Sequence, residues 1–403
     1  MVKAKVPAIV LGGSQNALSV ARNLSRHGIE VVAVNYAYEA VRFSRHARYV
    51  RLDGDSSPRA WERFLLGAES EPLRGSVLLA CADAAISIIV NNYTILSRKF
   101  LLEEPEPKIR HDLLDKCITY QRAREAGIPT VGYWPVRSRG DLERSMPEYG
   151  FPLVMKALYP PHADLLKSKA ILIRNREALI EAFSAAARLG VDVVLMEYIP
   201  GGDDKSCSYH TYLDEHGAPL FQFTNTVSRR FPLMSGEATY CVTAWIPDAA
   251  ELGLRFFRHL GFRGLGMLQF KRDERDGQLK IIEANIRFVA SDSLLAKSGL
   301  NLALIAYNRI TGRTQAPIPD FKKGVVLCRP FMDARAAWSL RKKGELRFSR
   351  WIAELTRINQ LPYFGWRDPL PALFVLARCG WRFGTRLLRR GMAQVSGALG
   401  AEA

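Results

Sequence analysis

The chain has 403 residues, of which 48% are hydrophobic and 24% are charged, a composition typical of a globular protein with two or three domains. No apolar run reaches the ~18 residues of a membrane-spanning helix, and the first residues do not follow the pattern of a signal peptide, so we expect neither feature. Six scattered cysteines without metal-ligand spacing favour reduced thiols and a cytoplasmic location.

The net charge of +17 is concentrated towards the end of the chain. Residues 321–403 contain 16 Lys and Arg but only 5 Asp and Glu, a net +11, which leaves +6 for the preceding residues. A segment with this excess indicates an anionic surface or partner for that part of the chain.

Strands alternate with helices in the first part of the sequence. Buried-type strands are expected at 7–11, 30–35 and 76–80, with helices at 17–27 and directly after Asp83. This alternation predicts a doubly wound parallel sheet whose ligand crevice lies beyond the carboxyl ends of the strands. The residues at those ends are Gly12, Gly13, Ser14, Asn16 and Asp83.

The turn after the first strand does not have the fingerprint of a nicotinamide-binding protein. Gly12-Gly13-Ser14 is not Gly-x-Gly-x-x-Gly, and Asn35 stands where a ribose-binding acid is expected. Two interpretations stay open: the glycines only permit a tight turn, or the turn holds part of a small substrate.

The middle of the chain alternates less regularly. Helices are expected at 112–127, 141–150, 177–189 and 251–260, and extended segments at 129–136, 151–157, 170–173, 193–199, 206–213, 219–227 and 238–245. The strand at 151–157 carries Lys156 among apolar residues. That lysine either protects a sheet edge or binds phosphate, and its apolar neighbours favour phosphate.

A hairpin at 266–283 then brings oxygen donors together. Glu283 and Asn285 are two residues apart and share one face of a strand, with Gln269 on the partner strand. Carboxylate and amide oxygens suit Mg²⁺, and Arg287 continues the same face. The alternative is an ordinary edge hairpin whose polar residues face water.

The order of these motifs resembles the ATP-grasp superfamily. The resemblance rests on Asp115-Lys116 before Gly127-Ile-Pro-Thr, the Lys156 strand, Met196-Glu197-Tyr198-Ile199-Pro-Gly-Gly-Asp, and Glu283-x-Asn285-x-Arg287. It is nearest to the carboxylate–amine ligase group that includes D-aspartate ligase. It implies a doubly wound, parallel-sheet pre-ATP-grasp domain (1–115), an α+β ATP-grasp domain (116–315) and a basic, mainly helical extension (316–403).

The resemblance also implies a role for each motif residue. It assigns the phosphates to Lys116, Lys156 and Lys169, the adenine to Glu197, Tyr198 and Ile199, and the ribose to Asp204, with Asp203 as an alternative. It assigns Mg²⁺ (Mn²⁺ as a substitute) to Gln269, Glu283 and Asn285, and the substrate carboxylate to Arg287 and Arg230, because only one of Arg229 and Arg230 can face inward. Two features depart from the family: Gln269 replaces the usual acid, and the loop at 158–168 lacks glycine.

The implied activity is ATP-dependent ligation of a small carboxylate to an amine through an acyl phosphate, which forms a carbon–nitrogen bond. Two alternatives stay open. One is a weakened, nucleotide-binding regulatory protein, and the other is an ATP-grasp enzyme with a thiol or phosphoryl acceptor. A homo-oligomer is compatible with either.

The last segment reads as a basic amphipathic helix. Its apolar face comprises Leu370, Leu373, Phe374, Ala377, Trp381 and Leu388, and its other faces carry Arg378, Arg382, Arg386, Arg389 and Arg390. Such a helix can lie on an anionic membrane, here at its cytoplasmic face, or dock on the protein itself. Nucleic acid is a poorer candidate partner, because no binding module accompanies the charge.

Overall fold

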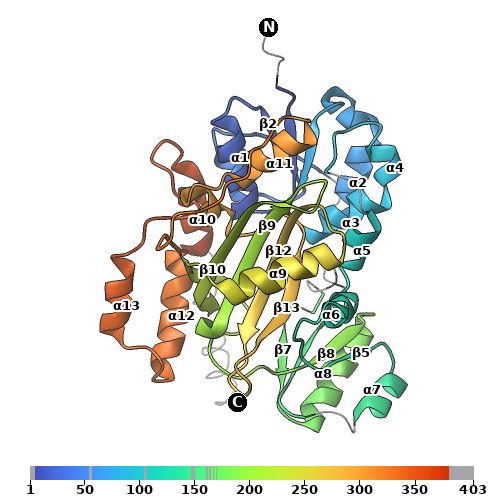
Figure 1. Cartoon of the computed structure of the whole chain (residues 1–403), viewed down its shortest axis with the longest axis vertical. Coiled ribbons are helices and arrows are strands. Elements are labelled where there is room, and N and C mark those ends of the chain that lie inside the picture. The colour runs from blue at the N-terminus through green and yellow to red at the C-terminus, as the bar shows by residue number, and fades with distance from the viewer. Residues whose placement is uncertain are drawn as a thin grey trace, which may run out of the picture.

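The computed structural model describes residues 5–53, 57–103, 107–146, 150–159, 162, 165–166, 168 and 170–380. Three sheets form its framework, one parallel and two antiparallel (Figure 1). Together with the helices that follow them, they confirm the predicted fold class.

The parallel sheet is doubly wound. It has the order β3-β2-β1-β4, with β1 at Ala8–Leu11, β2 at Val31–Asn35, β3 at Arg48–Arg51 and β4 at Val77–Ala80. Along β1, Ile9 and Leu11 pack with residues of α2 (Arg59–Leu66) and α3 (Asp83–Asn91), whereas Ala8 and Val10 pack with α1 (Gln15–Ser25). Alternation along one strand therefore buries both faces. Strand β3 and helix α2 were not predicted.

The second sheet has four strands in the order β5-β8-β6-β7, all pairs antiparallel. Their bounds are Tyr133–Val136 (β5), Leu153–Ala157 (β6), Ile171–Ile173 (β7) and Val193–Glu197 (β8). Helices α7 (Arg139–Ser145) and α8 (Arg176–Arg188) supply Leu142, Leu179 and Phe183 to the core on one face. The helix predicted at 141–150 thus begins two residues earlier, at a Ser138–Asp141 capping box.

The third sheet has six strands in the order β13-β12-β9-β10-β11-β14. They span Ser206–Leu213 (β9), Pro219–Phe231 (β10), Glu237–Thr243 (β11), Gly264–Arg272 (β12), Leu279–Asn285 (β13) and Val326–Cys328 (β14). Helix α9 (Pro247–His259) covers one face, where Phe257 meets Gly266 and Gly253 meets Tyr209. One end of the opposite face packs with α10 (Asp292–Lys297) and α11 (Leu302–Ile310).

Short helices connect these units. They are α4 (Tyr93–Leu96), α5 (Pro107–Asp112) and α6 (Lys116–Glu125), with 3-10 turns η1 (Ala40–Phe43), η2 (Ala68–Leu73) and η5 (Asp203–Lys205). The helix predicted at 112–127 begins only at Lys116, because the Asp115 side chain accepts from the amides of Cys117 and Ile118. The Tyr120 hydroxyl then donates to the Ile282 carbonyl at 2.7 Å, which fixes α6 against β13.

The end of the described chain is helical, as predicted. Helices α12 (Pro330–Lys342) and α13 (Phe348–Leu355) stand side by side at the edge of the molecule (Figure 1). Because β14 pairs with β11, the third sheet continues past residue 315. The domain boundaries stay predictions. No helix among the described residues is long and apolar enough to cross a membrane.

Residues 370–380 form a helix anchored on the parallel-sheet unit. Phe374 stacks on Phe43 with ring centroids 4.5 Å apart, and Arg378 lies 3.6 Å from Glu39. Just before this helix, buried Asp368 accepts from Arg22 at 2.9 Å. The described part is therefore docked, with Leu370, Leu373 and Leu376 on its exposed side. The predicted helix residues Trp381, Arg382, Arg386, Leu388, Arg389 and Arg390 lie outside the described residues.

Candidate active site

Lys156 lies on the face of β6 that turns away from α7 and α8. Leu153, Met155 and Ala157 are buried in the core beneath those helices, so alternation directs Lys156 towards the third sheet. Burial lowers the pKa of its ammonium group to about 8, Glu283 opposes this shift, and Lys116 and Arg230 add to it. These electrostatic contacts join four of the predicted site residues. We call the group Lys116, Lys156, Gln269, Glu283 and Asn285 the intersheet site.

The β12–β13 register brings the predicted metal donors together. Gln269 stands directly opposite Glu283, and Met267 stands opposite Asn285. A bulge places Ile282 as an extra residue between Glu283 and Ile281, a device that re-aims side chains beside functional sites. Cross-strand partners have Cβ atoms about 4.5–5.5 Å apart, so the amide and the carboxylate can reach one ion. Among the described residues, neither the Gln269 side chain nor the Glu283 side chain has a hydrogen bond or ion pair.

This donor set fits a hard cation that also binds phosphate. It contains one carboxylate and two amides, which is why no cluster of three His, Cys, Asp or Glu side chains occurs among the described residues. Mg²⁺ commonly takes one or two carboxylates and completes its shell with water and phosphate oxygens. Assignment of Gln269, Glu283 and Asn285 to Mg²⁺ therefore stays a prediction that this geometry supports.

The Arg287 guanidinium is held by Asp83, which the sequence placed at the ligand crevice but did not pair with Arg287. Asp83, at the carboxyl end of β4, accepts from Arg287 Nε at 2.6 Å and from Nη2 at 3.0 Å. Although burial opposes it, this pairing raises the pKa of Arg287 above its ordinary value. The bidentate contact fixes the guanidinium at the crevice of the parallel sheet. Nη1 donates to the Phe288 carbonyl at 3.3 Å, so the predicted contact with a substrate carboxylate would use the second N–H groups of Nη1 and Nη2.

The glycine turn borders the same crevice. Gly12 and Gly13 have φ angles of 73° and 80°, which explains both glycines by conformation alone. The Ser14 hydroxyl lies 3.3 Å from the Tyr363 hydroxyl, which arrives from the C-terminal segment. A substrate role for this turn stays a prediction.

Arg229 and Arg230 point to different surroundings. Arg229 is buried and forms a bidentate pair with Asp333, with Nε and Nη2 at 2.8 and 3.0 Å, and it also contacts Glu354. Arg230 instead lies within electrostatic range of Lys156 and Asp203. Of the two, only Arg230 adjoins the intersheet site, and its role with substrate stays a prediction.

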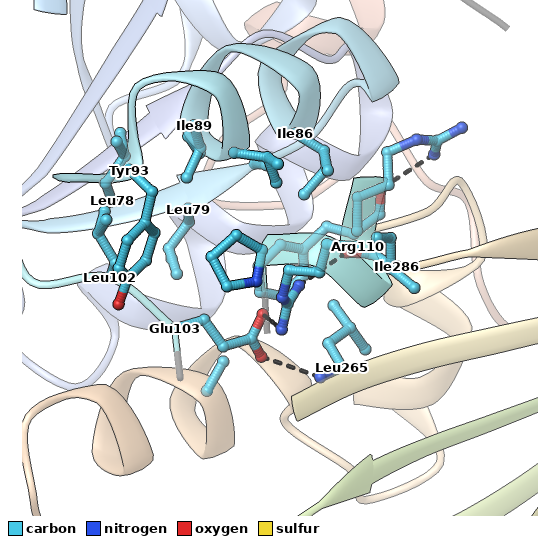
Figure 2. A pocket seen from close by; sticks show the side chains of 16 residues that line it. Leu78, Leu79, Ile86, Ile89, Tyr93, Leu102, Glu103, Arg110, Leu265 and Ile286 are labelled. Carbon is cyan, nitrogen blue, oxygen red and sulfur yellow. Dashed lines mark hydrogen bonds and ion pairs between the residues drawn. The ribbon is translucent and has the colours of Figure 1, made fainter. Parts of the chain in front are cut away.

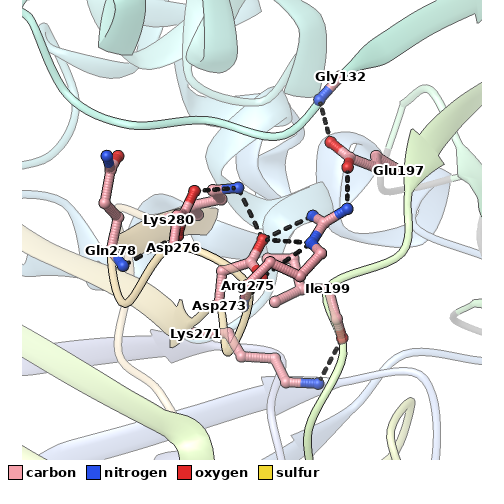
Figure 3. Close-up of polar contacts among 9 residues, drawn as sticks. All are labelled: Gly132, Glu197, Ile199, Lys271, Asp273, Arg275, Asp276, Gln278 and Lys280. Atoms are coloured by element: carbon pink, nitrogen blue, oxygen red, sulfur yellow. Dashed lines mark hydrogen bonds and ion pairs between the residues drawn. The ribbon is translucent and has the colours of Figure 1, made fainter.

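The predicted adenine hinge is already engaged by the β12–β13 turn (Figure 3). Glu197 accepts from the Gly132 amide at 3.2 Å and pairs with Arg275, which in turn binds buried Asp273. Lys271 donates to the carbonyls of Ile199 and Gly201 at 2.9 and 2.8 Å. These contacts fix the hinge backbone, and sequence reasoning did not find Lys271, Asp273 or Arg275.

The other hinge residues differ in exposure. Tyr198 lies under the Lys271 ammonium, 5.4 Å from the ring centroid. Asp203 accepts from the Met234 amide at 3.4 Å, and burial raises its pKa, whereas Asp204 is exposed. Assignment of the ribose to Asp204, with Asp203 as the alternative, stays a prediction. Lys169 lies outside the described residues.

Two pockets lie on either side of the Arg287 strand end. One is lined by Asp83, Lys116, Tyr120 and Glu283, and forms the corner of the intersheet site. The other is mainly apolar and lies beneath α3 (Figure 2). Its Arg110–Glu103 pair is satisfied internally: the atoms are 2.9 Å apart, and Glu103 also accepts from the Leu265 amide. Arg287 also lines this pocket, with its guanidinium paired to Asp83.

Comparisons with known proteins support the fold. No family model matches the chain. D-aspartate ligase of Enterococcus faecium is 24% identical over 316 residues, which cover 73% of this chain and 74% of that protein. The N5-carboxyaminoimidazole synthetase of Staphylococcus aureus, solved with ADP, has 16% identity and a TM-score of 0.62 over 80% of this chain and 82% of its own. The L-amino acid ligase of Bacillus licheniformis has 16% identity and a TM-score of 0.60 over 81% and 79%.

The chain has the same fold as these enzymes, which is the ATP-grasp fold that its motifs predict. An ATP-grasp fold explains why the second and third sheets face each other with Lys156 and Glu283 between them. It also explains why strands from residues far apart in sequence supply one site.

Proposed function

We propose that this ATP-grasp protein is an ATP-dependent carboxylate–amine ligase. The observation that carries the proposal is the pairing of the intersheet site with the Arg287–Asp83 crevice. Lys156 and Glu283 face each other across the sheets, and Arg287 follows Glu283 on the same strand end. The residues proposed to bind the ATP phosphates therefore lie next to Arg287, a side chain that can bind an anion.

In the proposed reaction, a substrate carboxylate oxygen attacks the γ-phosphorus of ATP, and ADP leaves. Lys156 and Lys116 balance the charge of the phosphates, and Arg287 orients the attacking carboxylate. An amine nitrogen then attacks the acyl carbon, the phosphate leaves, and the nitrogen loses a proton. No side chain has to act as a nucleophile, because positioning and charge stabilisation suffice.

Mg²⁺, or Mn²⁺ in its place, would be held by Glu283 and Asn285 with Gln269 opposite. When bound, it supplies neutralisation of the phosphate charge. The single carboxylate makes the cation depend on nucleotide for the rest of its shell. Glu283 and Gln269, without partners in the described part of the chain, are poised for that role.

The relative's name suggests the first acids to test. The Enterococcus faecium relative is named for aspartate, so both enantiomers of aspartate belong in the panel, beside other amino acids and dipeptides. We expect ADP release that needs Mg²⁺ and one acid. Adding hydroxylamine should convert the acyl phosphate to a hydroxamate, which identifies the activated acid without knowledge of the natural amine.

The alternatives give different results in the same assay. ATP binding without ADP release over the whole panel would contradict the ligase and favour a regulatory protein. ADP release without any hydroxamate would favour an acceptor other than a carboxylate. A thiol acceptor would still give a hydroxamate, but its product would lack the new carbon–nitrogen bond.

A further inference from the structure

The connection between α12 and α13 carries exposed aromatic and basic side chains together. We call residues 338–352 the hairpin tip; they contain five Lys or Arg and one Glu. Trp338 is 60% exposed, Phe348 52% and Ile352 44%. Large apolar side chains at such exposure need an explanation when they lie side by side.

These side chains form one surface. Trp338 and Arg341 are three residues apart on α12, and the Arg341 guanidinium lies 5.5 Å from the Phe348 ring centroid on α13. Phe348 and Ile352 are four apart on α13, so they lie on one side of it. Trp351 turns the other way and donates to Asp333 at 3.0 Å, which fixes α13 to α12.

The charges of the tip are exposed and mostly uncompensated. Arg341, Lys342, Lys343 and Arg347 are all exposed, and none has an ion pair within the described residues. Lys342 instead sits 5.5 Å from the Trp338 ring centroid. Cations interleaved with aromatic and aliphatic groups are the pattern of a surface that meets lipid headgroups and the start of the acyl region.

We propose that the hairpin tip docks on an anionic lipid bilayer surface. The tip joins α12 and α13 at the edge of the molecule (Figure 1), on the far end of a helix, α12, that packs on β10 and β11. Its net charge of +4 complements anionic headgroups, and its rings provide the apolar contact that headgroup attraction alone lacks. The proposal is independent of the proposed reaction.

Other occupants fit this surface less well. A second copy meeting the same patch across a two-fold axis would oppose four unpaired cations with four more. Single-stranded nucleic acid is usually held in a basic groove, whereas the tip is a convex helical corner. The exposed face of the 370–380 helix is a separate surface, because that helix is anchored on Phe43 and Glu39.

Co-sedimentation with vesicles of phosphatidylcholine containing about one third phosphatidylglycerol tests the proposal. We expect the full chain to sediment at low salt, to detach as salt is raised, and to ignore pure phosphatidylcholine. Trp338→Ser with Phe348→Ser should abolish sedimentation. Lys342→Gln with Lys343→Gln should lower the partition coefficient about tenfold to thirtyfold, because the two lysines are expected to contribute similar amounts to the attraction to an anionic surface.

A matched control is Ile180→Ser with Leu189→Ser, which removes exposed apolar side chains near α8. That pair should leave vesicle binding unchanged. All these side chains are exposed, so each variant should keep its thermal transition, which is checked first.

Three results would overturn the proposal. One is full-length protein that ignores anionic vesicles at low salt. Another is loss of binding on Leu373→Ser with Leu376→Ser while the tip variants bind normally, which assigns docking to the 370–380 helix. The last is a concentration-dependent dimer in sedimentation velocity that Trp338→Ser dissociates, which assigns the tip to a second copy.

Discussion

The intersheet site and the hinge, proposed to bind the phosphates and the adenine of one nucleotide, differ in how their polar side chains are paired. At the phosphate end, the side chains of Lys156, Gln269 and Glu283 have no hydrogen-bond or ion-pair partner among the described residues. At the adenine end, Glu197 and the Ile199 carbonyl are already bound by Arg275 and Lys271. We therefore expect the phosphate end to be completed by its ligand, whereas contacts within the protein already hold the adenine end in place.

This contrast has an energetic basis. A buried or half-buried charge without a partner is costly, so it gains most when a ligand of opposite charge arrives. A hinge whose polar groups are already paired gains little charge interaction from adenine, but its backbone is fixed before the ring binds. Substitutions at the phosphate end should thus act on chemistry and affinity, and those at the hinge only on positioning.

The largest expected effect is at Glu283. Glu283→Ala removes the only carboxylate proposed for the cation, so Mg²⁺-dependent ADP release should fall by about 100- to 1000-fold or more. Steady-state ADP release with the activating acid measures it. Glu181→Ala, an exposed acid on α8, is the control and should be silent. Normal turnover in the Glu283 variant would contradict the proposal that the Glu283 carboxylate binds the cation.

The second largest expected effect is a loss of stability at Arg229. Arg229 and its neighbour Arg230 differ in the same way, because Arg229 is paired within the protein and Arg230 adjoins the intersheet site. Arg229→Met should lower the free energy of unfolding by about 3–5 kcal/mol, because Asp333 would remain buried without its main partner. Arg230→Met should leave stability within about 0.5 kcal/mol and instead slow ADP release. Chemical denaturation and turnover of both variants measure the two effects. Equal destabilisation by both would show that Arg230 also serves the fold.

Lys156 should make ATP binding depend on pH, which distinguishes the phosphate end from the adenine end. Lys156→Ala should lower the affinity for ATP about tenfold to a hundredfold and leave the affinity for adenosine almost unchanged, because the lysine is proposed to contact phosphate. The pKa of Lys156 is lowered to about 8, and bound phosphate favours its charged form. ATP binding should therefore take up a proton, and affinity should fall above pH 8 by up to about tenfold per pH unit.

Titration calorimetry in two buffers of different ionisation enthalpy measures this proton uptake. The stability consequence has the opposite direction. Because the folded pKa lies below the unfolded value, Lys156 destabilises the fold below pH 8, and this cost is relieved as pH rises towards its ordinary value. Lys156→Arg cannot titrate in this range and should bind ATP with no change above pH 8. Persistence of the pH effect in that variant would assign it to another group.

Local pattern was enough to predict the strands that carry the residues proposed for the phosphate end. Alternation along β6 and β13 fixed which side of the sheet Lys156, Glu283 and Asn285 occupy, and the observed strands have nearly the predicted bounds. The pattern worked because each strand has one face against a helical core. The same logic required that Arg229 and Arg230 face different surroundings.

The remaining features depend on contacts that no local pattern encodes. Asp83 and Arg287 are 204 positions apart, and Arg275 meets Glu197 across 78. Strand β3 was missed because its side chains are largely exposed, so it lacks a buried-strand pattern. Lys271, Asp273 and Arg275 looked like a solvated turn, and only the fold brings that turn to the hinge.

The smallest expected effect is at Arg275, and it tests the adenine end directly. Arg275→Met breaks the contact with Glu197, but Asp273 keeps Lys280 and Lys271 still holds the Ile199 carbonyl. Because the Arg275–Glu197 pair is partly exposed, its loss should lower the affinities for adenosine and for ATP by the same factor of about two to five. Equilibrium binding of both ligands measures this, with Arg272→Met on the same hairpin as the control. A larger loss for ATP than for adenosine would mean that Arg275 serves the phosphates, and the division between the two ends would then fail.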